Sequence, residues 1–308
     1  MEESLIKKKL NINKKNILKK LKNEYMGRTF STLCGIFIVI VTLLIICFIF
    51  SKGINIFLKY GYSLKEFIFS SSWNPDGENP TFGSKIFILG SILVSLGALL
   101  ISTPISIALA VSMNYISPKL GQKFLQPALE LFVGIPSVVY GWIGIVLFIP
   151  IIKRGFGGLG FSLLAGMIVL SIMILPTIVN ISSDAIKSIP KDYVEASLAL
   201  GATRWQTITK VVLPSAKSGI LTSVVLGLAR AFGEALAVQM VIGNTIKLPR
   251  GVVYPTSTLT SILTMDMANT VSRTPWNDAL WALASILLFI SFMFIITIRF
   301  VGKRGEVK

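Results

Sequence analysis

The sequence contains no histidine and only two cysteines in 308 residues. Histidine is the commonest metal ligand and the usual general base near neutral pH, so its absence argues against a catalytic metal site. Cys34 and Cys47 lie thirteen residues apart in one apolar stretch, too far along a helix to form a disulfide. We therefore expect no metal, no cofactor and no catalytic residues.

Charged residues are also scarce. They make up 14% of the chain, where a soluble domain has roughly 25%, whereas 53% of the residues are hydrophobic. Roughly 20 apolar residues are needed for one helix to cross a hydrocarbon core about 30 Å thick. Six mainly apolar stretches have this length: Phe30–Phe50, Ile86–Met113, Ala128–Ile152, Phe161–Ile181, Ser218–Ile242 and Ala279–Ile298. The composition predicts an all-α, polytopic membrane protein with about six transmembrane helices, with kinks where Pro104, Pro136 and Pro176 interrupt the apolar stretches.

The net charge of +16 has a distribution that fits membrane orientation better than nucleic-acid binding, because the basic residues form no surface interleaved with aromatics. Twenty of the 30 Lys and Arg residues lie on the side that would hold both termini, and nine lie on the opposite side. Since basic residues collect on the cytoplasmic side, both termini are expected in the cytoplasm. No nucleic-acid partner is expected.

The chain divides into five segments on this interpretation. They are a Lys-rich cytoplasmic tail (1–29), the first transmembrane helix (30–50), an external loop (51–85), a core (86–300) and a cytoplasmic C-terminus (301–308). The tail is compatible with an interfacial helix on anionic lipid or with a solvated chain, and its sequence does not choose between them.

A charged segment, residues 182–217, interrupts the core and must lie outside the bilayer. Pro190 and Asp192 are suited to the first turn of a helix, and Gly201 can end that helix in a left-handed conformation. A second helix from about Thr203 is expected to stop at Pro214. This pattern alone fits an ordinary connecting loop as well as an element gripped by another protein.

Arg230 and Glu234 place two charges inside the fifth apolar stretch, four residues apart. A charge at the bilayer centre costs at least about 2.5 kcal/mol, so the two are expected to share one helix face. Two interpretations are open. The pair is a structural ion pair, or Arg230 offers its planar donor fork to a passing oxyanion while Glu234 holds it in place.

Glu130 lies just after Lys119 and Lys123 at the predicted start of the third apolar stretch. A solvated carboxylate near the positive end of a helix dipole is favourable. We expect that role for Glu130 in preference to a place on the substrate path.

The charged segment resembles the EAA loop of permeases of ATP-binding-cassette (ABC) importers. That motif reads E-A-A, three residues, G, nine residues, I-x-L-P, and the matching positions here are Glu195, Ala196, Ser197, Gly201, Val211, Leu213 and Pro214. Ser197 and Val211 depart from the usual residues but keep their size. The resemblance implies a type I ABC importer permease fold in which this loop couples to a separate ATPase, with Glu195 as polar anchor, Ala196 as close contact and Gly201 as the turn. No G-x-x-x-x-G-K-[ST] loop occurs in the sequence, so ATP hydrolysis is expected in a partner chain and not in this one.

Three stretches, 134–142, 199–205 and 229–244, are similar to phosphate-specific permeases of the PstC type, and the similarity extends over roughly residues 30–302. It implies import of inorganic phosphate, a heterodimer with a PstA-like permease, a PstB-like ATPase dimer and a PstS-like binding protein. Sulfate, molybdate and phosphonate remain alternative cargoes. A secondary anion transporter would use the intramembrane charges for ion coupling. Such transporters often show inverted repeats, but no repeat is visible in this sequence, and the EAA-type loop would be unexplained.

Overall fold

The structure, a computed structural model, describes residues 26–304 and divides into two units, Met1–Lys52 and Gly53–Lys308, which are described separately. The described helices are α2 (Met26–Gly53), α3 (Asn55–Leu58), α4 (Leu64–Phe69), α5 (Lys85–Val111), α6 (Pro118–Leu120), α7 (Gln126–Gly134), α8 (Ser137–Ile143), α9 (Ile149–Phe156), α10 (Leu163–Lys187), α11 (Lys191–Ala199), α12 (Arg204–Thr207), α13 (Leu213–Ser215), α14 (Lys217–Gly233), α15 (Leu236–Ile242), α16 (Leu259–Asp266) and α17 (Pro275–Arg304). π-Helical turns at Ser112–Ile116, Gly121–Leu125, Gly144–Phe148 and Ile208–Val212, a 3₁₀ turn at Met267–Asn269 and the short strands β1 (Trp73–Asn74) and β2 (Thr81–Phe82) complete the fold.

The described part of the first unit is helix α2, which contains the whole predicted stretch Phe30–Phe50. The hydroxyls of Thr32 and Thr42 each donate to a carbonyl one turn earlier, at 2.8 Å, so these polar groups are satisfied within the helix. Cys34 and Cys47 are free thiols, as their spacing predicts. Of the predicted Lys-rich tail, residues 1–25 lie outside the described residues, as do residues 305–308 at the other terminus.

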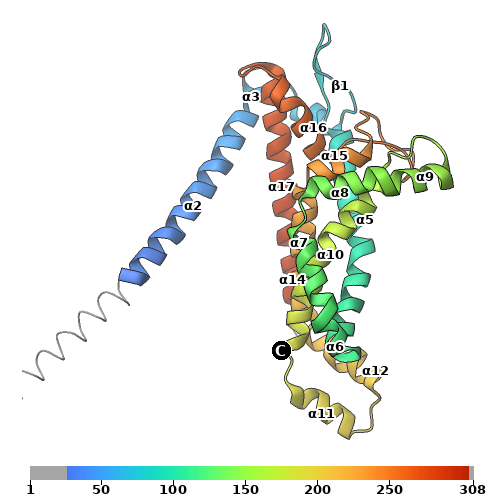
Figure 1. The fold of residues 1–308 in the computed structure, drawn as a ribbon. Coiled ribbons are helices and arrows are strands. Elements are labelled where there is room, and N and C mark those ends of the chain that lie inside the picture. Colours follow the sequence, from blue (N-terminus) through green and yellow to red (C-terminus); the bar gives the residue numbers. More distant parts are fainter. Residues whose placement is uncertain (1–25, 305–308) are drawn as a thin grey trace, which may run out of the picture. The chain divides into compact units, whose positions relative to one another are not determined.

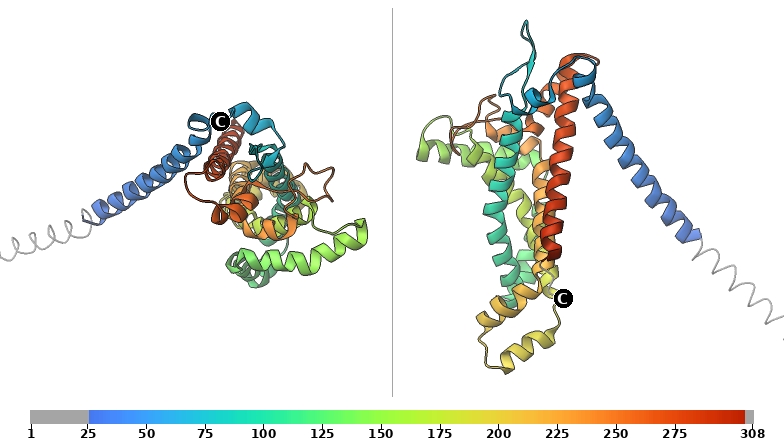
Figure 2. Two further views of the ribbon diagram at one scale, coloured as in Figure 1. Left: turned by 90° about the horizontal axis from the view of Figure 1, so that it is seen from above. Right: turned by 180° about the vertical axis from the view of Figure 1, so that it is seen from behind.

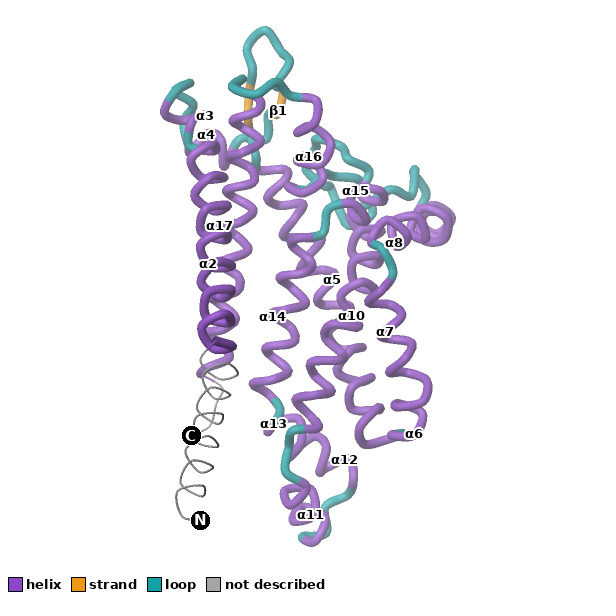
Figure 3. Tube along the Cα trace, turned by 60° about the vertical axis from the view of Figure 1, so that its left-hand side comes forward, coloured by secondary structure: helices purple, strands orange, loops and turns teal. Residues whose placement is uncertain are grey.

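The second unit is a bundle in which α5, α10, α14 and α17 run side by side (Figures 1 and 3). The interface of α5 with α10 is the most extensive in the unit. The buried face of α5 carries a stripe of small residues: Gly90, Ser91, Ser95, Ala98, Ser102 and Ser106. Small side chains let two helices approach closely where lipid provides no hydrophobic driving force between them. Gly227 allows a similarly close approach of α14 to α10, because a Cβ at this position would lie 2.7 Å from Ile178 Cγ1 of α10.

By length and composition, five helices in the described part of the chain could cross a membrane, or six if the bent pair Arg204–Ser215 and Lys217–Gly233 is one span. The two parts of this pair meet at an angle of 67°. The prediction of an all-α membrane protein with about six spans is therefore confirmed.

The predicted third span, Ala128–Ile152, has the interruption expected at Pro136, and it is a full break and not a kink. It breaks between α7 and α8 at Pro136, whereas α5 and α10 continue through Pro104 and Pro176. After the break, α8 and α9 run across the bundle instead of along it (Figures 1 and 2). In an unbroken helix the Phe132 carbonyl would accept from the backbone N–H of residue 136, which proline lacks. The Tyr140 hydroxyl donates to that carbonyl at 2.7 Å and so stabilises the break.

The predicted fifth span, Ser218–Ile242, is also broken, because α14 ends at Gly233 and α15 begins at Leu236. The Glu234 carboxylate accepts from the Ala237 backbone N–H at 3.3 Å, and its carbonyl accepts from the Thr260 hydroxyl at 2.9 Å. These bonds occupy groups that a continuous helix would have paired internally. Tertiary contacts with α16 thus favour the break.

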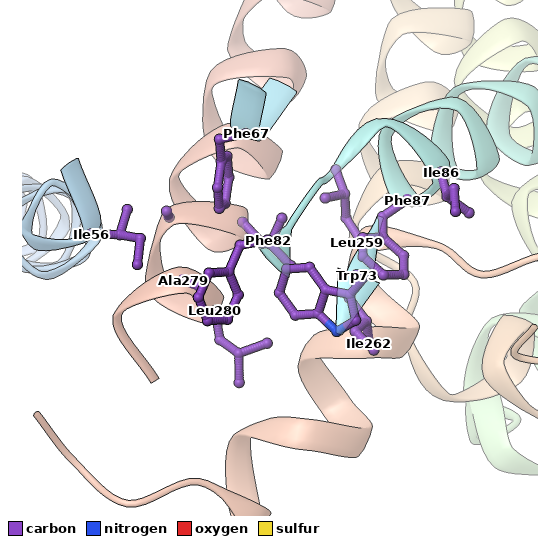
Figure 4. Close-up of a cluster of buried hydrophobic side chains, with 12 residues drawn as sticks. Ile56, Phe67, Trp73, Phe82, Ile86, Phe87, Leu259, Ile262, Ala279 and Leu280 are labelled. Carbon is purple, nitrogen blue, oxygen red and sulfur yellow. The ribbon is translucent and has the colours of Figure 1, made fainter. Parts of the chain in front are cut away.

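Residues 54–85 fold over one end of the bundle, which we call the hairpin end. The pairs Trp73↔Phe82 and Asn74↔Thr81 join β1 and β2 antiparallel. Figure 4 shows the buried cluster beneath them, where Trp73 packs edge-on against Phe82 and Phe87 with ring centroids 5.6 and 5.2 Å apart. Residues from α3, α4, α5, α16 and α17 complete this cluster. Residues 54–85, predicted as an external loop, therefore form a packed cap that shares one buried cluster with α5, α16 and α17.

The loop that follows α15 is bonded to the start of α10. The backbone N–H groups of Leu163 and Leu164 donate to the carbonyls of Tyr254 and Val252, at 3.0 and 2.7 Å. The first N–H groups of a helix have no partner within it, so the loop supplies the missing acceptors. The first turn of α10 and the loop 243–256 are held together as one element.

Gly90 provides a test of the close approach between α5 and the segment before α16. A Cβ at Gly90 would collide with the backbone carbonyl of Ser257, and backbone cannot move aside as a flexible side chain can. We expect Gly90→Ala to lower the free energy of unfolding by about 1–3 kcal/mol, measured by thermal unfolding of the purified complex in detergent. Gly155→Ala is the matched control, because a Cβ at Gly155 meets open space. An equal effect of the two substitutions would contradict this packing.

Candidate functional site

The segment predicted to leave the bilayer lies at the end of the bundle opposite the hairpin, which we call the α11 end (Figure 1). Helix α11 follows Pro190, and Gly201 adopts the left-handed conformation with φ +82°. Thr203 begins α12 with reciprocal bonds to Gln206: its hydroxyl accepts from Gln206 N at 3.2 Å, and its N–H donates to Gln206 Oε1 at 2.9 Å. The expected order of helix, glycine turn and helix is confirmed.

Helix α11 has no buried residue in this chain. Glu195 and Ala196 are exposed. So are four large apolar side chains around them: Tyr193 (56%), Leu198 (44%), Leu200 (90%) and Trp205 (64%). Large exposed apolar patches commonly belong to interaction sites. The motif alone missed these four residues; the signal that could have found them is apolar side chains within a charged segment.

The other predicted coupling residues have internal roles or lie at a bend. The hydroxyls of Ser197 and Thr207 are 3.0 Å apart, which ties α11 to α12. Leu213 packs against the buried cluster at the α11 end. The helix ends at Ser215, one residue after Pro214, and the chain bends by 67° before α14, so the expected stop is confirmed to within one residue. The preceding π-helical turn, Ile208–Val212, is wider than an α-turn, which relieves the clash that a proline ring causes.

Arg230 lies near the end of α14, partly buried against α10. Its Nη1 donates to the hydroxyl of Thr177 at 2.9 Å. Thr177 directly follows Pro176 in α10. Within residues 26–304, Thr177 is the hydrogen-bond partner found for this guanidinium, which has five N–H donors. The site therefore combines a fixed cation, one hydroxyl group and donors that no described residue uses.

The expected sharing of one helix face by Arg230 and Glu234 is wrong. The backbone of Glu234 is extended, with φ −76° and ψ 124°, because the helix has already ended. No ion pair joins the two side chains in the described part of the chain, and the Glu234 carboxylate instead caps α15. The Glu234 carboxylate therefore stabilises the break after α14 and does not neutralise the charge of Arg230.

A cavity of about 580 Å³ lies at the hairpin end, between the start of α5 and the loop after α15. Its lining includes the basic residues Lys247 and Arg250 and the polar residues Ser71, Thr245 and Tyr254. No acidic residue of the described chain lines it. The lining favours an anion. Sequence reasoning did not single it out, because segments far apart along the chain meet there and no local motif marks the two basic residues.

The comparison with protein families matches residues 102–304 to the model described as "Binding-protein-dependent transport system inner membrane component". The chain belongs to this family. Among curated relatives of this permease, the "Probable ABC transporter permease protein YqgH" of Bacillus subtilis (strain 168) is 49% identical over 286 residues, covering 92% of this chain and 93% of that protein. The "Phosphate transport system permease protein PstC" of Pasteurella multocida (strain Pm70) is 32% identical over 272 residues, covering 82% and 83%.

Solved structures support the fold. The permease matches a chain of a bacterial ABC transporter involved in the import of the acidic polysaccharide alginate, with a TM-score of 0.64 at 17% identity, covering 95% of this chain and 100% of that one. It also matches a chain of the MetNI methionine ABC transporter, with a TM-score of 0.55 at 19% identity, covering 71% and 92%. The expected type I ABC importer permease fold is confirmed.

The permease is thus a membrane-embedded transport subunit of an ABC importer and not an enzyme, because its homologues are permease subunits and the ATPase is a separate chain. Importer permeases of this family work with a partner permease, an ATPase and a binding protein.

Proposed function

We propose that this permease conducts inorganic phosphate and that Arg230 is the residue that meets the anion inside the bundle. The observation that carries the proposal is a partly buried guanidinium fixed by one hydrogen bond to Thr177, with its remaining donors unused by the described residues. A guanidinium remains charged at any physiological pH, and its planar fork matches two oxygens of a tetrahedral oxyanion. The relatives named as phosphate permeases support this choice of cargo.

The cavity at the hairpin end supports import of an anion from that end of the bundle. Lys247 and Arg250 line it, and positive charge at an entrance raises the local concentration of anions. We place this end on the outer side of the membrane, where a PstS-like binding protein delivers its cargo. The anion then passes from this cavity toward Arg230.

The assembly we propose is a heterodimer of this chain with a PstA-like permease, attached to a PstB-like ATPase dimer. The exposed surface formed by Tyr193, Leu198, Leu200 and Trp205 docks on the ATPase, with Glu195 and Ala196 at its centre. Ser197 and Gly201 keep α11 and α12 in one fixed arrangement, so that a displacement of α11 reaches the bundle. Leu213 and Pro214 lie where this arrangement joins α14.

We place both termini and the segment 182–217 in the cytoplasm. The distribution of Lys and Arg, twenty against nine, supports this orientation. Within the second unit, α17 runs from the hairpin end to the α11 end (Figure 1), so its last residues share a side with α11. The loop 51–85 is then external, and residues 301–308 are cytoplasmic.

Uptake by whole cells tests the cargo. Cells that lack this chain should lose high-affinity uptake of radiolabelled phosphate and regain it when the chain is restored. An excess of unlabelled phosphate should compete in the restored cells, whereas sulfate, molybdate or a phosphonate should not. Undiminished phosphate uptake without the chain, or equal competition by sulfate, would assign the transporter to another substrate.

The role of Arg230 is tested by removing its charge. Arg230→Ala should reduce phosphate uptake by about 10- to 100-fold, the effect of losing one or two charge-assisted hydrogen bonds. The mutant chain should still assemble with its partners, as measured by copurification. Arg230→Lys is the matched control; it keeps the charge without the fork and should retain an intermediate rate. Normal uptake in the alanine variant would leave Arg230 with a purely structural role.

Gly201 tests the coupling role of the α11–α12 turn. Proline cannot adopt a positive φ, so Gly201→Pro should disturb the turn and separate ATP hydrolysis from transport. The measurement is phosphate transported per ATP hydrolysed in proteoliposomes containing the whole transporter. Gly201→Asn should stay coupled, because asparagine tolerates the left-handed conformation. A normal ratio for the proline variant would argue against coupling through this turn.

A further inference from the structure

Glu130 on α7 exposes a carboxylate on a surface that is otherwise apolar. Its neighbours Leu131 and Val133 are 73% and 46% exposed. One hydrogen bond to it is found in the described part of the chain: Gln126 Nε2 donates to Oε1 at 3.0 Å. An ionised carboxylate can accept about four hydrogen bonds. Most of its capacity is therefore unused by residues of this chain.

The position of Glu130 along its helix sets its distance from the lysines at the start of that helix. Helical structure begins at Pro118 and continues to Gly134, with Lys119 and Lys123 in its first turns. At 1.5 Å per residue, Glu130 lies roughly 10 Å beyond Lys123 and roughly 16 Å beyond Lys119. If the lysines mark the edge of the hydrocarbon, the carboxylate is near its middle. Contrary to expectation, Glu130 does not stand at the start of the helix, because the helix begins three turns earlier.

Three surroundings could meet this carboxylate: lipid, a water-filled path or another protein. Lipid is disfavoured, because ionisable groups in membrane-spanning helices face protein or water. A water-filled path does not agree with the exposed apolar side chains of Leu131, Phe132 and Val133 around it. At Gly134, one turn further on the same face, an added Cβ would meet no atom within 4 Å, which leaves room for a second helix to approach closely. Another protein chain agrees with the ionisable carboxylate, with the exposed apolar side chains around it and with the open space at Gly134.

We propose that the face of α7 formed by Gln126, Glu130, Val133 and Gly134 is where the partner permease docks, and that the partner supplies an arginine or lysine to Glu130. Helix α7 lies at the edge of the second unit (Figure 3), so this face is accessible to another chain. A two-fold contact between two copies of this chain would bring two Glu130 carboxylates into one seam. A different chain can carry the opposite charge. The inference rests on the pairing of two permeases and not on the identity of the cargo.

Site-specific photocrosslinking tests the location of this interface. A benzoyl-phenylalanine residue replaces Val133 in the transporter expressed with its native partner chains, and the membranes are irradiated. The expected result is an adduct between this chain and a permease of different sequence, identified by mass spectrometry of its peptides. The same probe at Phe292, an exposed residue of α17, should not give that adduct, because α17 packs on α14 and not on α7. A Val133 adduct with a second copy of this chain, with the ATPase or with lipid alone would overturn the proposal.

Substitution of Glu130 tests the charge pair. Glu130→Gln keeps the shape of the side chain and should reduce the partner permease retained in detergent by roughly tenfold, as expected when an interfacial charge pair is lost. Glu130→Lys should reduce it further. Glu66→Gln is the matched control; it removes an exposed carboxylate from α4, away from α7, and should retain the partner fully. Equal retention by all three variants, with normal amounts of this chain in the membrane, would overturn the proposed pair. Both experiments are read without transport, so a different cargo would not change their outcome.

Discussion

Two helix breaks in the described part of this permease, at Pro136 and at Glu234, each have a polar side chain bonded to a backbone group that the break leaves without its helical partner. In a bilayer no water is available to replace that partner, and an unpaired peptide group costs several kcal/mol. Tyr140 supplies the donor where Pro136 breaks the helix, and Glu234 supplies the acceptor where α14 gives way to α15. At the start of α10 the carbonyls of Tyr254 and Val252 do the same. The bends of the fold are therefore located by particular side chains and loops.

The second break also decides the surroundings of Arg230. It begins four residues after Arg230, at Glu234. A continuous helix would have carried Arg230 and Glu234 on one face, where they would have neutralised each other. The break leaves the guanidinium bound to a neutral hydroxyl, which does not cancel its charge. An anion-conducting role is compatible with that arrangement, whereas a closed ion pair would not be.

The sequence was sufficient for the number of spans, for the helical class and for the turn at Gly201, because each depends on local properties: apolar length, helix-capping residues and a left-handed glycine. It was insufficient wherever a distant residue decides the outcome. Pro104, Pro136 and Pro176 look alike in the sequence, yet of these three only Pro136 breaks its helix, while α5 and α10 continue through the other two. Likewise, the spacing of Arg230 and Glu234 predicts a shared face until Thr260 of α16 bonds to Glu234. The roles assigned to the coupling and pathway residues remain predictions.

Helix α10 has a particular position between the two ends of the second unit. Its first turn is bonded to the loop that borders the basic cavity, and its last turn, at Lys187, is followed almost directly by α11 at Lys191. Along its length it packs against α5 and α14, and its Thr177 holds Arg230. A change in the tilt of this one helix would therefore move the rim of the cavity, the guanidinium and the base of α11 in the same step, without any need for a separate chain of contacts between them.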